Sequence, residues 1–280
     1  MIERQEFSAV ERVVNAMGVR TMVSEREGCE PALVCIHGNS LSRQIFTSLF
    51  SVSWLSHHRI VSYDLPGHGG SERPTVRSVY GIDGYAAHLS ALISALGIRR
   101  FVLVGVSLGG HIAMQAADSC LSSMISGLFL CGAPPIRELG DIARAFVSIA
   151  GVPSLFQRDI DRVDAEKIAR TLTRKRSDQL RCIESIVASD PVARERLVEG
   201  FTTEAIHDEY AFVTSTDLPI RLCYGEDERV VNLKYLEETG LSDWLQGSVR
   251  ILPNEDHLPD MSEHSAFVVA LCELVGSVNG

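Results

Sequence analysis

The stretch FVLVGVSLGG, residues 101–110, decides how this chain can fold. It is a short, continuously apolar run that passes directly into the pattern G-x-S-x-G. A segment with helical spacing of apolar residues, Gly110 to Ala117, follows at once. A continuous apolar run of this length is typical of a strand buried on both faces of a parallel sheet. We therefore expect a strand, a tight turn that carries Ser107, and a helix.

The turn around Ser107 suits a nucleophile. A serine on such a strained turn is exposed, and a side chain at Gly105 or Gly109 would collide with the neighbouring strand or helix. A glycine-rich turn can instead bind phosphate at the N-terminus of its helix. The chain has neither G-x-G-x-x-G nor a Walker pattern here, so we interpret Ser107 as a nucleophile.

Working outward, further apolar runs of strand length alternate with helical stretches. The expected strands are 32–36, 59–63, 101–104, 127–131, 220–224 and 248–252, and the expected helices are 84–96, 110–117 and 266–275. Strand, crossover helix and strand in repeated order predict an α/β fold with a doubly wound, mostly parallel sheet.

One stretch, residues 134–215, departs from this alternation. It has no good strand, begins at Pro134-Pro135, and contains helix-like segments at 142–150, 165–172, 178–189 and 192–201. We interpret it as an inserted helical cap. The expected domains are a core formed by residues 1–133 and 216–280, and a cap formed by residues 134–215.

The bulk composition excludes several classes of protein. The net charge of −10 argues against a nucleic-acid partner, which needs a basic surface. The charged segment Met1 to Glu6 has no apolar region after it, so we expect no secretory signal. No run of about 18 apolar residues occurs, so we expect no membrane span.

The cysteines point to a reducing compartment. There are seven, an odd number, without a CxxC pair, which argues against disulfides and against a zinc site. Cys35, Cys131 and Cys223 lie in strand-like runs and are expected to be buried thiols. We predict a cytoplasmic protein that uses no metal and no organic cofactor.

A second loop completes the chemistry expected around Ser107. A tetrahedral intermediate needs two preorganised N–H donors, an oxyanion hole. One is expected from the backbone of Leu108, and the other from Asn39 in the loop that follows the strand ending at Ile36. His37 in this loop is expected to hold it by side-chain hydrogen bonds, although it could also be the catalytic base.

Three sequence motifs, taken in their order along the chain, resemble those of a known superfamily. His37-Gly38 after a strand, the segment DLPGHGGS at 64–71, and the G-x-S-x-G segment at 105–109 together resemble the α/β-hydrolase superfamily over nearly the whole chain. The resemblance implies that the loop at 64–71, with Asp64 and His68, is scaffold. It also implies the order nucleophile, acid, histidine along the chain.

That order places the base late, at His257 in the segment 252–259. Relatives usually carry Gly before this histidine, where this chain has Asp256. His264 is a weaker candidate, and His111 is expected to be packed structure. His57, His58, His88 and His207 lie in stretches without catalytic context and are expected at the surface.

The acid is expected after the strand at 220–224. Relatives have it three residues after Gly225, which is Glu228 here, and Asp227 is the alternative. Either carboxylate could hold the imidazole N–H and stabilise the imidazolium. The other place that this fold allows, after the strand at 127–131, has no carboxylate.

Finer details resemble the α/β-hydrolase-fold N-acylhomoserine lactonases, which degrade quorum signals. They include His37 to Ser40 followed by Ile45-Phe46, Gly84-Tyr85-Ala86, Ala133-Pro134-Pro135, and Glu as the acid. The resemblance implies a serine hydrolase that opens a lactone through an acyl-enzyme, its substrate a small ester or lactone with an acyl chain.

Three other functions fit the same sequence. A general carboxylesterase or thioesterase of small acyl substrates would use the same residues. A cofactor-independent dioxygenase or perhydrolase, and a small-molecule receptor without turnover, are also built on this fold. A substrate panel, oxygen uptake and single-turnover labelling distinguish them.

Overall fold

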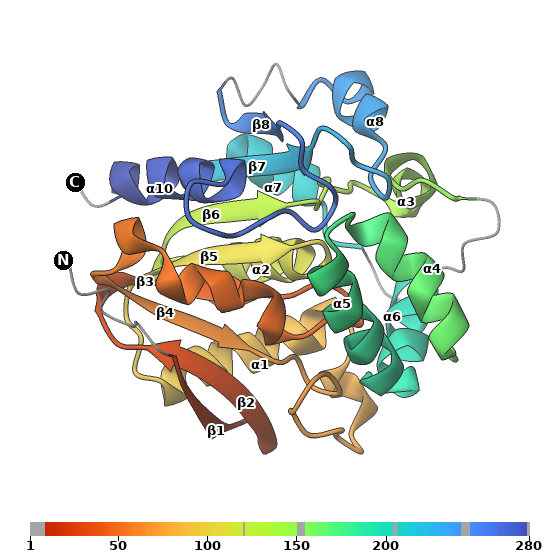
Figure 1. The fold of residues 1–280 in the computed structure, drawn as a ribbon, viewed down its shortest axis with the longest axis horizontal. Coiled ribbons are helices and arrows are strands. Elements are labelled where there is room, and N and C mark those ends of the chain that lie inside the picture. The colour runs from red at the N-terminus through yellow and green to blue at the C-terminus, as the bar shows by residue number, and fades with distance from the viewer. Residues whose placement is uncertain (1–8, 120, 150–154, 204–205, 242–246, 279–280) are drawn as a thin grey trace.

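The computed structural model describes residues 9–119, 121–149, 155–203, 206–241 and 247–278 (Figure 1). An eight-stranded sheet has the order β1-β2-β4-β3-β5-β6-β7-β8. The strands are β1 Val10–Ala16, β2 Val19–Arg26, β3 Cys29–Ile36, β4 His58–Tyr63, β5 Phe101–Val106, β6 Ile125–Cys131, β7 Ile220–Gly225 and β8 Val249–Leu252.

The helices follow the strands in the expected alternation. They are α1 Ile82–Ala95, α2 Leu108–Asp118, α3 Leu139–Ala145, α4 Arg162–Leu172, α5 Arg176–Ala188, α6 Pro191–Thr203, α7 Glu209–Ser215, α8 Leu233–Glu238 and α10 Ala266–Val278, with short 3₁₀ helices η1 Arg43–Ser51, η2 Ser53–Leu55 and η3 Arg77–Val79.

The sheet is parallel from β3 to β8. Only the pairs β1 with β2 and β2 with β4 are antiparallel among the described strands. The predicted α/β fold with a doubly wound, mostly parallel sheet is therefore confirmed. The hairpin of β1 and β2 was not foreseen from the sequence.

Helices cover both faces of the sheet, α1 and α2 on one and η1 and α10 on the other (Figure 1). Neighbouring residues of β5 point to opposite faces, because the side-chain period of a strand is two. Leu103 belongs to the buried cluster that contains Leu89 of α1, whereas Val104 belongs to the cluster that contains Phe267 of α10. Burial on both faces explains why the strand is continuously apolar.

The predicted cap lies between β6 and β7, where the chain forms α3 to α7. Helices α4, α5 and α6 lie beyond the carboxyl ends of the central strands (Figure 1). The division into a core of 1–133 and 216–280 and a cap of 134–215 stays a prediction.

One predicted cap helix is displaced. Instead of spanning 142–150, helix α3 ends at Ala145, and Ala150 lies outside the described residues. Phe146 is extended and pairs with Val231, and the N–H of Val147 donates to the carbonyl of Val230 at 2.7 Å. Pairing with this distant segment competes with helix continuation, which local spacing could not reveal.

Among the helices that the structure describes, none is long and apolar enough to cross a membrane. The cytoplasmic location stays a prediction from the sequence.

Candidate active site

Ser107 sits on a strained turn between β5 and α2. Its φ of 53° and ψ of −121° lie outside the regions that L-residues usually adopt. A Cβ on Gly109 would lie 2.1 Å from the carbonyl oxygen of Ile36, and one on Gly105 would lie 2.5 Å from that of Gly109. The two glycines allow the strand, the turn and the helix to pack closely, with Ser107 at the turn just beyond the end of β5.

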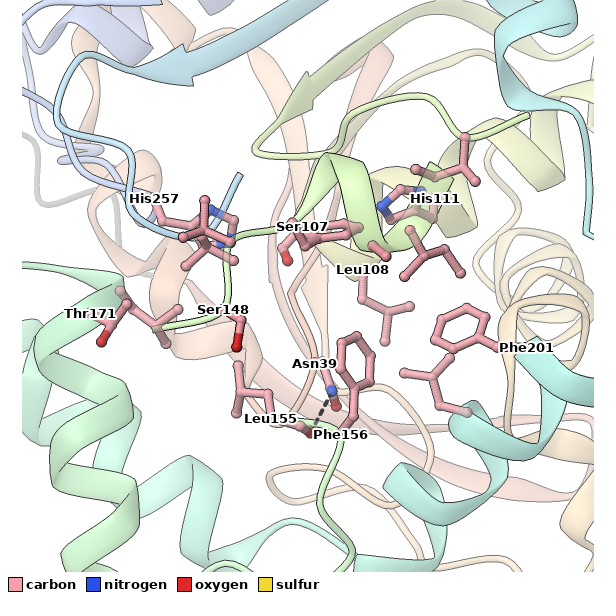
Figure 2. A pocket seen from close by; sticks show the side chains of 18 of the residues that line it. Asn39, Ser107, Leu108, His111, Ser148, Leu155, Phe156, Thr171, Phe201 and His257 are labelled. Atoms are coloured by element: carbon pink, nitrogen blue, oxygen red, sulfur yellow. Dashed lines mark hydrogen bonds between the residues drawn. The ribbon is translucent and has the colours of Figure 1, made fainter. Parts of the chain in front are cut away.

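His257 comes from the loop after β8 and reaches the same place. Its ring lies against Gly132, just after β6, where an added Cβ would meet Cε1 at 2.8 Å. The N–H of Ser107 donates at 2.8 Å to the carbonyl of Cys131, the residue just before Gly132. The side chains of Ser107 and His257 therefore share the carboxyl end of β6, and both line one pocket (Figure 2).

Glu228 holds the other side of the His257 ring. Nδ1 lies 3.0 Å from each carboxylate oxygen, and the Glu228 side chain is fully buried. Since a carboxylate only accepts, Nδ1 carries the proton and Nε2 of the neutral ring is left as an acceptor.

The pKa of Glu228 is lowered despite its burial. Desolvation raises this pKa, but the charge and hydrogen bond of His257 and the N–H groups of Val230 and Val231 outweigh it. The two N–H groups donate at 2.8 and 3.1 Å. The carboxylate is thus kept ionised next to the imidazole.

Asp227, the alternative acid, lies elsewhere. Its side chain is 41% exposed and forms an ion pair with Arg174 at 2.7 Å. Of the two candidate carboxylates, the structure thus brings Glu228 to His257.

The loop that carries Asn39 is held by two hydrogen bonds of the His37 ring. The two ring nitrogens of His37 pair with the carbonyl of Gly38 at 2.8 Å and with the N–H of Leu65 at 3.0 Å. Burial lowers the pKa of His37 to about 4, so the ring is neutral. The predicted loop-holding role of His37 is confirmed, and both its nitrogens are occupied.

The two expected oxyanion donors lie at this pocket. Asn39 and Leu108 both line it, and no described residue accepts a hydrogen bond from the backbone N–H of either. The Asn39 side chain donates to the carbonyl of Leu155 at 2.9 Å (Figure 2), so its amide group is tied to the cap.

Asp64 and His68 are scaffold, as expected. Buried Asp64 accepts from the backbone N–H of Arg43 at 2.7 Å and from its guanidinium at 2.6 Å. His68 accepts from the N–H of Ser40 at 3.2 Å and is neutral, since burial lowers its pKa to about 3.

The surface expectation for His88 is wrong. The ring is fully buried, and Nε2 lies 2.8 Å from the hydroxyl of Thr21. The antiparallel strand β2 covers it, and that strand was not foreseen. His57 is exposed as expected, and His264 is exposed with its ring edge against Trp54.

The pocket has a volume of about 420 Å³. Apart from the residues already described, its walls are mainly apolar side chains of the cap, which are Ile136, Ile142, Phe146, Leu155, Phe156, Ile168, Leu172, Leu197, Phe201 and Ile206. Within the described ranges, no group of three or more His, Cys, Asp or Glu side chains could hold a metal ion.

The model of the alpha/beta hydrolase family matches residues 33–271. The chain belongs to this family. The solved structure of a mutant of the N-acyl homoserine lactonase AidH, in complex with N-hexanoyl homoserine, is similar over 97% of this chain and 98% of that one, with a TM-score of 0.84 and 25% identity. The esterase RhEst1 from Rhodococcus sp. ECU1013 shares the fold, with a TM-score of 0.72, 19% identity and coverage of 98% and 99%.

Curated relatives match shorter segments of this hydrolase. Monoacylglycerol lipase ABHD6 from Bos taurus is 30% identical over 110 residues, which is 39% of this chain and 32% of the lipase. Across such relatives the hydrolase spans between 26% and 48% of their length. The family match and the similarity to AidH over nearly the whole of both chains show an alpha/beta hydrolase.

Two polar residues of the pocket of this hydrolase were missed as functional candidates. His111 was read as packed structure, and Glu209 was not considered, yet both line the pocket and bind each other. Glu209 follows the N-cap Asp208 of α7, which is a signal for a helix start and not for a site. They lie 98 positions apart, so no local pattern pairs them.

Proposed function

We propose that this hydrolase is a serine esterase that opens the ring of N-acylhomoserine lactones, with Ser107, His257 and Glu228 as its triad. The observation that carries the proposal is the buried Glu228 carboxylate bound to Nδ1 of His257, in the pocket that holds Ser107. This arrangement leaves Nε2 of the base free for the serine hydroxyl.

The first half of the reaction forms an acyl-enzyme. Nε2 of His257 takes the proton of Ser107 while the serine oxygen attacks the lactone carbonyl. The oxyanion is held by the backbone N–H groups of Asn39 and Leu108. When the intermediate collapses, the ring C–O bond breaks and His257 gives the proton to the leaving alcohol.

The second half releases the product. His257 takes a proton from water, the hydroxide attacks the acyl carbon, and the proton returns to Ser107 as the ester bond breaks. The leaving alcohol of a lactone stays tethered to the acyl group, so water must attack faster than the ring recloses. Side chains of the protein and water carry every proton in this scheme, so it needs no metal or organic cofactor.

The pocket supports an acyl substrate. Its volume of about 420 Å³ lies in the range of small-molecule sites, and its cap walls are apolar. AidH, the lactonase with a similar structure, has been crystallised as a mutant with N-hexanoyl homoserine lactone. We infer that the acyl chain lies against the cap while the lactone carbonyl faces Ser107.

The test is proton release at constant pH from N-acylhomoserine lactones of several chain lengths and from p-nitrophenyl esters. We expect fast lactone opening, well above ester turnover, and loss of both in Ser107→Ala. The variant should still bind the lactone, which calorimetry can measure. Normal turnover in Ser107→Ala would contradict the serine mechanism.

Other outcomes lead to the alternative functions. Ester turnover without lactone opening would make the protein a carboxylesterase or thioesterase that uses the same triad. Oxygen uptake without hydrolysis would point to a dioxygenase. Labelling of Ser107 by an activated ester without multiple turnover would point to a receptor.

A further inference from the structure

The pocket contains a second histidine–glutamate pair, formed by His111 of α2 and Glu209 of α7. Nδ1 of His111 lies 2.8 and 2.9 Å from the two carboxylate oxygens of Glu209. The carboxylate also accepts from the N–H of Ile136 at 2.9 Å. Both side chains are buried, at 10% and 5% exposure. The pair resembles His257 with Glu228 in geometry but is not bonded to it.

The second nitrogen of His111 is free to meet a ligand. Since the Glu209 carboxylate only accepts hydrogen bonds, Nδ1 carries a proton, and Nε2 is an acceptor in the neutral form of the ring. His111 lines the pocket, and no residue in the described part of the chain bonds Nε2. The ring packed near it, Phe146 with a centroid separation of 6.2 Å, is apolar. The wall therefore presents one oriented acceptor in apolar surroundings.

This acceptor lies close to the reacting serine. Ser107 is the residue just before α2 and His111 lies in its first turn, and both line the same pocket. In Figure 2, Ser107 lies between the rings of His257 and His111. A substrate whose carbonyl carbon is attacked by Ser107 extends from there into the pocket that His111 also lines.

A purely structural role explains the pair poorly. Burying charged or strongly polar partners costs desolvation free energy, so that an apolar pair of similar volume is often as stable. Glu209 fixes the tautomer and the orientation of the ring, as second partners of functional histidines do.

We propose that Nε2 of His111 accepts a hydrogen bond from an amide N–H on the carbon next to the scissile carbonyl, with Glu209 as its positioning residue. The substrate class is then α-acylamino lactones and esters, rather than esters in general. This inference rests on the proposed chemistry at Ser107 and names the group that selects its substrate.

The test compares pairs of substrates in which the amide N–H next to the carbon beside the scissile carbonyl is replaced by an oxygen atom. One pair is N-hexanoyl homoserine lactone and α-hexanoyloxy-γ-butyrolactone, and the other is the p-nitrophenyl esters of N-hexanoylglycine and hexanoyloxyacetic acid. We expect the wild type to prefer the amide member of each pair about tenfold or more in kcat/KM. In His111→Leu this ratio should fall to about 1, and His111→Gln, which keeps an acceptor, should restore part of it.

His264→Leu is the matched control, because it removes an exposed histidine outside the pocket, and it should keep the wild-type ratio. An unchanged ratio in folded His111→Leu would overturn the proposal. An equal loss of kcat/KM on the amide and the ester member of each pair, together with a lower melting temperature, would also overturn it. That result would indicate a purely structural role for the pair of His111 and Glu209.

The two proposals fail differently. If the wild type cleaves the linear esters but no lactone, the proposed lactonase function is wrong. The two linear esters still test the role of His111 in that case. If no substrate shows turnover that depends on Ser107, both proposals fail.

Discussion

At Glu228, three hydrogen-bond donors converge on one buried carboxylate. They are Nδ1 of His257 and the backbone N–H groups of Val230 and Val231. A buried carboxylate on its own would protonate, whereas these donors keep its pKa below the ordinary value. The negative charge is thus present where an imidazolium would form.

Replacing Glu228 by Gln tests this role. The variant keeps the shape but loses the charge that stabilises the imidazolium, so we expect kcat to fall about 10²- to 10⁴-fold. Asp227→Asn should change kcat less than about threefold, because its exposed ion pair does not touch His257. Steady-state kinetics at constant pH measures both, and the reverse order would transfer the acid role to Asp227.

At the scale of elements, the strand–turn–helix around Ser107 depends on contact between backbones. The start of α2 lies so close to β3 that Gly109 has no room for a methyl group. This contact places the N–H of Leu108 and the loop after β3 at one pocket.

Gly109→Ala should therefore destabilise the fold, by about 3 kcal/mol or more, since backbone atoms would have to move. Gly276→Ala is the control, because an added Cβ at this exposed position in α10 meets nothing within 4 Å. The control should raise stability by up to about 1 kcal/mol. Urea unfolding measures both, and equal midpoints would contradict the close-packing argument.

A second element-scale feature ties the cap to the histidine loop. Arg174, between α4 and α5, donates to Asp256 through its backbone N–H at 2.8 Å and through its side chain. The N–H of Leu258 also donates to the carbonyl of Leu172 at 2.8 Å. Asp256 thus holds the loop of His257 against the cap.

We expect Asp256→Ala to loosen this loop and to reduce kcat/KM between about 10- and 100-fold, because small misplacements of a base slow proton transfer strongly. Asp227→Asn serves as the control, since it removes only the exposed ion pair of Arg174. Wild-type kcat/KM in Asp256→Ala would show that the loop is held by other contacts.

At the scale of the whole molecule, acid sensitivity follows from buried neutral histidines. Burial lowers the pKa of His37 to about 4, of His68 to about 3 and of His88 to about 4. Below about pH 6.5 the unfolded chain protonates these rings while the folded chain does not. The unfolded state then binds more protons, so stability falls as the pH falls toward 4.

Each ring should cost roughly 1 kcal/mol of unfolding free energy between pH 6.5 and 5.5. His88→Leu removes one of the three titrations, so its stability should depend less steeply on pH than that of the wild type. Urea unfolding at both pH values measures the difference. If the unfolding free energy of the variant depended on pH as steeply as that of the wild type, the pKa of His88 would not differ between the folded and the unfolded state.

The extent of prediction differs along the chain. The segment 101–110 indicated a strand, a turn and a helix because its apolar run and its glycine spacing are local signals that can be recognised without knowledge of distant contacts. The edge hairpin of β1 and β2 was missed, since its strands are partly exposed and lack a continuous apolar run. The displacement of α3 was also missed, because Phe146 forms an isolated β-bridge with a residue 85 positions away.

By itself, the sequence determined the α/β sheet, the strained turn of Ser107 and the positions of His257 and the acid cluster in chain order. The sheet and the turn follow from local spacing, whereas the positions of His257 and the acid follow from the resemblance to the α/β-hydrolase superfamily. Only the tertiary structure decided that Glu228 and not Asp227 meets His257, that His88 is buried, and that His111 finds Glu209. These are contacts between distant segments, and their distances are set by the packing of sheet, loops and cap, which no local pattern encodes.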